Sequence, residues 1–104
     1  MAWVWLMVAG LLEVVWALAL KASDGFTRWV PTSIMAVGLA ASFWFLSRAF
    51  DAIPMGTAYA VWTGIGAAGV AVLGMALYGE PVSLARVGFL MLILIGIVGL
   101  KLAA

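Results

Sequence analysis

The chain has 104 residues, of which 68% are hydrophobic and 9% are charged, and its formal net charge is +1. A soluble domain averages about 45–50% apolar and about 25% charged residues, and a small one could not bury this much apolar surface. The sequence contains no Cys and no His, which excludes disulfides, thiolate or imidazole metal sites and His-dependent nucleophilic chemistry. No basic run is present that would attract nucleic acid. We therefore predict an integral membrane protein with no cofactor.

Four apolar segments follow one another along the chain. The first covers residues 2–20, which at about 1.5 Å per residue span about 28 Å, close to the roughly 30 Å of a bilayer core. It is not a secretory signal peptide, because it lacks a basic start and a small-residue cleavage site and carries Glu13 in mid-span. The other three spans are expected at residues 31–49, 54–78 and 82–102, beginning at Pro31, Pro54 and Pro81, since proline is tolerated at helix starts. We predict an all-α protein with one domain, residues 1–104, of four transmembrane helices.

The distribution of Lys and Arg defines almost no preferred orientation. Four spans put Arg48 and Lys101 on one side of the membrane, and Lys21, Arg28 and Arg86 on the other. A difference of one charge gives no firm orientation under the positive-inside rule. Two interpretations follow: an accident of a short protein, or dual topology, in which copies insert both ways up. An antiparallel homodimer of such copies would reproduce the inverted repeat of larger transporters.

Glu13 is the one ionisable residue deep within a span. A charge at that depth costs on the order of 2.5–3.5 kcal/mol on insertion scales, so such residues are candidates for function. The alternative is a protonated carboxyl that hydrogen-bonds a neighbouring helix. A proton and a cation that compete for this carboxylate would couple two fluxes without ATP. Gly10 and Trp16 share its helical face, where Gly10 lets another helix approach and the Trp16 N–H can reach a carboxylate.

Three further polar candidates lie on the second and third spans. Tyr59 and Trp62 are three residues apart on one helical face, and each combines an aromatic surface with a polar tip. Ser42 is the polar residue in the middle of the second span. The alternatives are interior packing for the two aromatic residues, and for Ser42 a hydroxyl bonded back to its own helix.

Glycines mark two more features. Residues 64–69 match G-x-G-x-x-G, but the dinucleotide fingerprint needs a preceding strand, and this motif lies inside an apolar helix. We expect Gly64 and Gly66 to form a hinge in the third helix instead. Gly88, Gly96 and Gly99 predict a helix–helix contact on the fourth span, at the dimer interface.

The whole chain resembles the small multidrug resistance family in its length, its four spans and its single glutamate in the first of them. The matching stretches are Glu13–Ala17, Lys21–Arg28, Pro54–Gly66 and Glu80-Pro81. The resemblance implies an antiparallel, dual-topology homodimer in the bacterial inner membrane that exchanges protons for organic cations. It further implies that Glu13 of both subunits binds substrate and proton in alternation, with Tyr59 and Trp62 in the binding site. The glycine pair then matches the family's hinge, and the glycines of the fourth span match its dimerisation region.

Within that family, the sequence is more similar to exporters of guanidinium than to exporters of bulky quaternary ammonium compounds. Trp16 stands where the polyspecific members tend to have glycine, and Leu39 where they have tyrosine. In the guanidinium group, Trp16, Ser42 and Trp62 are expected to hold Glu13 by hydrogen bonds. Guanidinium is planar and pairs bidentately with a carboxylate, whereas a quaternary ammonium has no N–H donor and needs an aromatic wall.

The leading hypothesis is a proton-coupled antiporter that exports guanidinium ion or small substituted guanidines by alternating access, a secondary active transporter and not an enzyme. Its expected partners are the organic cation, protons, membrane lipid and a second copy of itself. Three alternatives stay open: a polyspecific quaternary ammonium exporter, a non-transporting or heterodimer subunit, and a passive channel. The near balance of charges favours a homodimer, because the partners in heterodimers usually carry clear and opposite biases.

Overall fold

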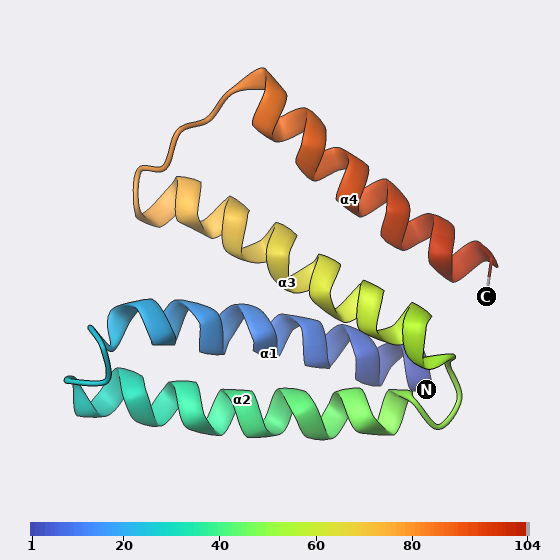
Figure 1. The fold of residues 1–104 in the computed structure, drawn as a ribbon, viewed down its shortest axis with the longest axis horizontal. Helices are drawn as coiled ribbons and strands as arrows, with labels where there is room; N and C mark the ends of the chain where they lie inside the picture. The colour runs from blue at the N-terminus through green and yellow to red at the C-terminus, as the bar shows by residue number, and fades with distance from the viewer. Residues whose placement is uncertain (104) are drawn as a thin grey trace.

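The computed structural model describes residues 1–103, and within them the chain forms four long helices (Figure 1). Each helix has 20 to 23 residues and is long and apolar enough to cross a membrane. These are α1 (Ala2–Ala22), α2 (Trp29–Ala49), α3 (Met55–Leu77) and α4 (Leu84–Ala103). The expected all-α fold of four membrane-spanning helices is confirmed, because long apolar runs leave the backbone no other way to satisfy its hydrogen bonds in lipid.

The three prolines lie at different positions relative to the helix starts. Pro54 is the N-cap of α3, as expected for a residue without a backbone donor. Pro31 is the third residue of α2, where its missing N–H removes no helical hydrogen bond. Pro81 does not begin the fourth helix: Ser83 caps it, accepting a hydrogen bond from the Arg86 N–H on its Oγ at 3.1 Å, so α4 starts at Leu84.

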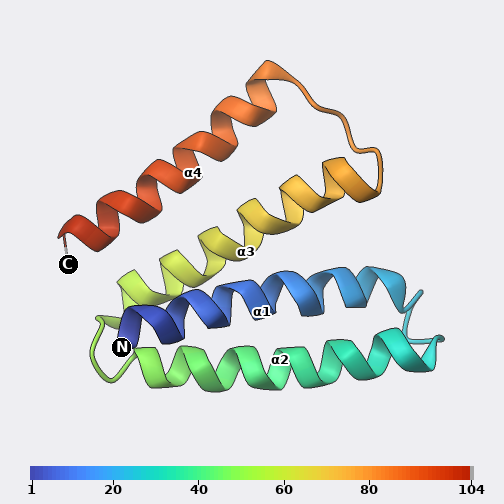
Figure 2. The same cartoon turned by 180° about the vertical axis from the view of Figure 1, so that it is seen from behind.

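The helices lie side by side in the order α2, α1, α3, α4 (Figures 1 and 2). Within residues 1–103, α1 packs against both α2 and α3, whereas α4 packs against α3 alone. The Cα atoms extend over 41 × 35 × 17 Å, so the subunit is a flattened layer. Both termini lie at the same end of this layer, as an even number of spans requires (Figure 1).

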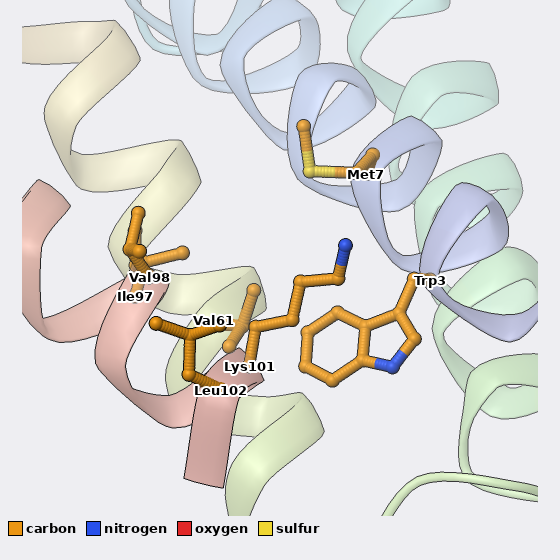
Figure 3. Close-up of a pocket in the computed structure, with 7 residues that line it drawn as sticks. All are labelled: Trp3, Met7, Val61, Ile97, Val98, Lys101 and Leu102. Carbon is orange, nitrogen blue, oxygen red and sulfur yellow. The ribbon is translucent and has the colours of Figure 1, made fainter. Parts of the chain in front are cut away.

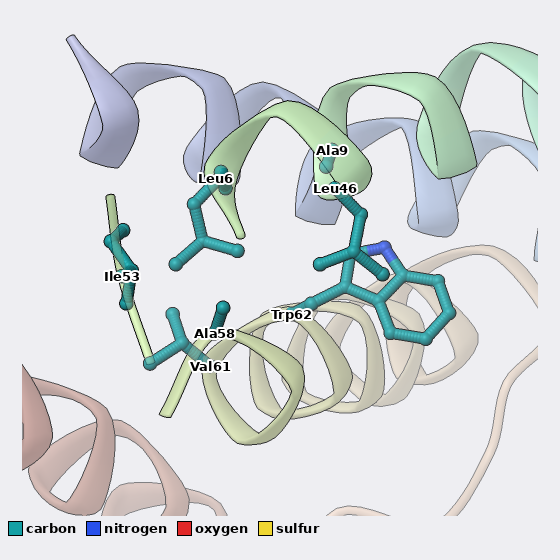
Figure 4. Close-up of a cluster of buried hydrophobic side chains, with 8 residues drawn as sticks. Leu6, Ala9, Leu46, Ile53, Ala58, Val61 and Trp62 are labelled. Atoms are coloured by element: carbon teal, nitrogen blue, oxygen red, sulfur yellow. The ribbon is translucent and has the colours of Figure 1, made fainter. Parts of the chain in front are cut away.

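The hydrophobic core is concentrated toward the end of the layer where the termini lie. Figure 4 shows its members, which come from α1, α2, α3 and the α2–α3 connection: Leu6, Ala9, Leu46, Ala49, Ile53, Ala58, Val61 and Trp62. No residue of α4 is buried. The apolar surface of α4 therefore faces lipid or another protein chain.

Candidate functional site

Glu13 lies near the middle of α1, eleven residues after the helix begins and nine before it ends. Its side chain borders a cavity of about 270 Å³, open on one side, between α1 and α3. The lining residues are Glu13, Trp16, Ala17, Thr63, Gly66, Ala67 and Val70. The carboxyl oxygen Oε1 is buried, and no group in residues 1–103 donates a hydrogen bond to it. A carboxyl oxygen at this depth requires a proton or a cation as its partner.

Gly66 provides the space in which the carboxyl group lies. A Cβ atom at Gly66 would overlap the Glu13 carboxylate, so any other residue would force the glutamate aside. Gly64 faces a different neighbour, because a Cβ there would lie 3.0 Å from Cδ1 of Ile97 in α4. Helix α3 runs unbroken through both glycines. The hinge stays a prediction, and the role of Gly66 in this conformation is close approach of α3 to Glu13.

Trp16 lines the same cavity as Glu13. Its indole Nε1 is buried and has no acceptor within residues 1–103. Gly38 of α2 leaves room for the base of this side chain, because a Cβ at Gly38 would come within 3.1 Å of the Trp16 Cβ. The expected hydrogen bond from Trp16 to Glu13 is therefore not formed in this conformation, although both residues line the same cavity.

Ser42 hydrogen-bonds both to Trp62 and to the backbone of α1. The Ser42 Oγ donates to the Ala9 carbonyl oxygen at 2.7 Å and accepts a hydrogen bond from Trp62 Nε1 at 3.0 Å. Each side chain has a single hydrogen-bond donor, and both donors are occupied here. The expected hydrogen bonds from Ser42 and Trp62 to Glu13 are therefore not formed in this conformation. The alternative for Ser42 is corrected, since its hydroxyl bonds to α1 and not to its own helix.

Tyr59 and Trp62 form an aromatic surface beside this hydrogen-bonded pair. Their ring centroids are 5.4 Å apart, and the ring centroid of Phe43 lies 5.8 Å from that of Trp62. Trp62 is buried, whereas Tyr59 is 52% exposed. Sequence reasoning placed Tyr59 and Trp62 together but missed Phe43, which its position next to Ser42 could have suggested. It also missed Thr63, which lines the Glu13 cavity next to Trp62 in sequence.

The remaining glycines fall into two groups. Gly10 is buried one turn before Glu13, and a Cβ there would lie 2.7 Å from the side chain of Ile65, so it lets α1 and α3 meet closely. A Cβ at Gly88, Gly96 or Gly99 would meet nothing within 4 Å. These three glycines of α4 make no close contact within residues 1–103, and their place in a dimer interface stays a prediction.

Replacing Ser42 with Ala should lower the free energy of unfolding by about 0.5–2 kcal/mol, the range of interhelical hydrogen bonds in membrane proteins. The change removes the acceptor of Trp62 Nε1 and one partner of the Ala9 carbonyl. Reversible unfolding in mixed micelles measures this change in the free energy of unfolding. Ser47→Ala is the matched control, because the Ser47 Oγ bonds only to the Trp44 carbonyl of its own helix, at 2.8 Å. Equal destabilisation by the two changes would contradict the structural role of Ser42.

The model of the small multidrug resistance protein family matches residues 1–93. The chain belongs to this family. A guanidinium exporter from Yersinia pseudotuberculosis is 59% identical over 104 residues, with both chains fully covered. A guanidinium exporter from Citrobacter freundii is 53% identical, and the match covers 99% of this chain and 98% of that protein. A guanidinium exporter from Salmonella typhimurium is 52% identical, and the match covers 100% of this chain and 99% of that protein.

The small multidrug resistance protein described here is a multi-pass protein of the bacterial inner membrane. It is a transporter rather than an enzyme. The resemblance inferred from the sequence is thereby confirmed at the level of the family.

Proposed function

We propose that this protein is an antiporter that exchanges protons for guanidinium, working as an antiparallel homodimer. The observation that carries the proposal is that Glu13, which lies midway along α1 and lines a cavity, has a buried Oε1 without a hydrogen-bond partner in residues 1–103. Guanidinium as the substrate is supported by the names of relatives that are 52–59% identical over nearly their whole length.

Guanidinium suits a site built around a carboxylate. Its planar N–H groups match the two oxygens of a carboxylate, as the guanidinium of Arg does. Trp16 Nε1 is a donor and cannot bond to the N–H groups of the substrate, but it can hold the carboxylate in position for them. The exposed ring of Tyr59 supplies a face that attracts a cation, although Tyr59 is not among the residues that line the Glu13 cavity within this subunit. This combination also accommodates small substituted guanidines.

Coupling follows from the competition of two ligands for Glu13. A carboxylate that holds a proton is neutral and does not bind a cation, whereas a deprotonated one at this depth needs a cation. In an antiparallel homodimer, two Glu13 carboxylates meet near the midplane, and the two halves are related as inverted repeats. Rocking of the subunits then exposes one site to each side in turn. Two carboxylates set an upper limit of two protons for each transport cycle.

The test is transport by the purified chain alone in proteoliposomes, with guanidinium added outside and the internal pH recorded. We expect guanidinium uptake accompanied by proton efflux. Transport of a quaternary ammonium without guanidinium would favour the polyspecific alternative instead. Guanidinium entry without proton movement would indicate a channel, and the absence of any transport would indicate a missing partner subunit.

Acidification should raise the apparent KM for guanidinium, because protons compete with it for Glu13. Where the carboxylates are largely protonated, one competing proton gives up to about a tenfold increase per pH unit. The maximal rate at saturating guanidinium should change less. Initial exchange rates at equal pH on both sides of the membrane measure both quantities. A constant KM across the pH range would contradict competition at one site.

A further inference from the structure

A second cavity lies between α1 and α4, and it shares no residue with the Glu13 cavity. Its volume is about 480 Å³, within the range of roughly 300–1,000 Å³ that is usual for ligand sites. Trp3 and Met7 of α1, Val61 of α3, and Ile97, Val98, Lys101 and Leu102 of α4 line it (Figure 3). It exists because α4 contacts α3 but not α1.

Lys101 is the one charged residue in the lining of this cavity. Its side chain reaches from α4 toward α1, and Figure 3 shows the amine between Trp3 and Met7. The Lys101 Nζ lies 5.7 Å from the centroid of the Trp3 ring. Within residues 1–103, the one ion pair joins Arg86 and Glu80 at the opposite end of α4. No described carboxylate therefore neutralises Lys101.

The charged residue and the apolar residues of this cavity lie at different depths in the membrane. Trp3 lies in the first turn of α1 and Lys101 in the last turn of α4, so both lie near the same membrane face, where Trp and Lys side chains meet lipid headgroups. Met7, Val61 and Ile97 continue the cavity as an apolar surface toward the membrane centre. A molecule that complements this surface has an anionic head and a hydrocarbon tail.

We propose that this cavity binds an anionic phospholipid, with its phosphate at Lys101 and Trp3 and one acyl chain between α1 and α4. The ammonium attracts the phosphate, and the Trp3 indole N–H is a second available donor. The same positive charge repels organic cations, so the cavity is not a second substrate site. The lipid would fill the space beside α4 that no side chain of this subunit occupies.

The test compares lipids retained by the protein after release from bilayers that contain equal amounts of phosphatidylglycerol and phosphatidylcholine with the same acyl chains. Native mass spectrometry counts the bound lipids. We expect phosphatidylglycerol to be retained about fivefold over phosphatidylcholine, the attraction of one Lys near an anionic surface. Lys101→Gln should bring the ratio close to one. Val98→Trp, which fills the cavity and keeps the charge, should reduce retention of both lipids.

Arg48→Gln is the matched control. Arg48 is a cation at the same end of the layer, with its Cζ 5.3 Å and 5.8 Å from the ring centroids of Trp5 and Trp44, and it does not line the cavity. This variant should keep the fivefold preference. A loss equal to that of Lys101→Gln would assign the preference to diffuse surface charge and overturn the proposal. Unchanged lipid retention in Lys101→Gln, or in a folded Val98→Trp, would overturn it too.

Discussion

Glu13→Gln should abolish proton-coupled guanidinium exchange, leaving a rate close to that of liposomes without protein. Glutamine has almost the same shape as glutamate, but it carries no charge and cannot release a proton. Removing one member of a buried ion pair costs about 3–5 kcal/mol, which corresponds to a loss of roughly 10² to 10⁴ in binding. Loss of the titrating group removes coupling as well. The measurement is internal pH and guanidinium uptake in the same proteoliposomes.

Asp51→Asn is the control for this substitution, because it makes the same carboxyl-to-amide change in the exposed α2–α3 connection. It should leave exchange within about twofold of the wild-type rate, since exposed charges contribute little. Both variants should purify with the same oligomeric state as the wild type. Proton-coupled exchange that persists in Glu13→Gln would refute the proposed mechanism.

Gly66→Ala should reduce guanidinium exchange strongly while leaving the protein folded. The new Cβ would overlap the Glu13 carboxylate, which lies at the end of a flexible side chain and can rotate away at small cost in stability. The carboxylate then moves away from its position beside Trp16. A displacement on the order of 1 Å at a reacting group costs up to about 10²-fold in rate, and we expect a loss of roughly that size. Exchange rates and reversible unfolding should be measured on the same preparation.

Gly56→Ala is the matched control on the same helix, because a Cβ at Gly56 would meet nothing within 4 Å. It should preserve both exchange and stability, apart from the small gain in helix propensity of Ala over Gly. If Gly66→Ala transported at the wild-type rate, the space at Gly66 would not be needed for Glu13 to work. If it failed to fold, Gly66 would have a packing role that outweighs the effect on the carboxylate.

The four helices could be predicted from the sequence because length and apolarity alone determine a membrane span. The residues at which the helices begin and end were harder to predict. Pro81 marked the fourth span in the sequence, but the side chain of Ser83 is what satisfies the first turn of α4. The packing of α4 could not be predicted either, because its sequence is apolar on all faces and does not indicate which face contacts α3.

Glu13 could be selected as a candidate site residue because a carboxylate in an apolar run is visible without any structure. The partner of Ser42 could not, because it is the backbone carbonyl of Ala9, and every residue has one. The contact between Gly66 and Glu13 depends on how α1 and α3 are rotated about their axes, which one sequence does not specify. The same rotation determines that the Trp16 N–H is buried without an acceptor in residues 1–103 while Trp62 bonds to Ser42.

The four helices of one subunit form a single layer, 17 Å thick across its Cα atoms. The Glu13 cavity is open on one side, and in the proposed homodimer the second subunit closes it. Formation of a working site is then a bimolecular encounter in the plane of the membrane, as for other obligate dimers. When dimers are scarce, their number rises with the square of the subunit density. Halving the expression of this protein would then remove about three quarters of its transport capacity.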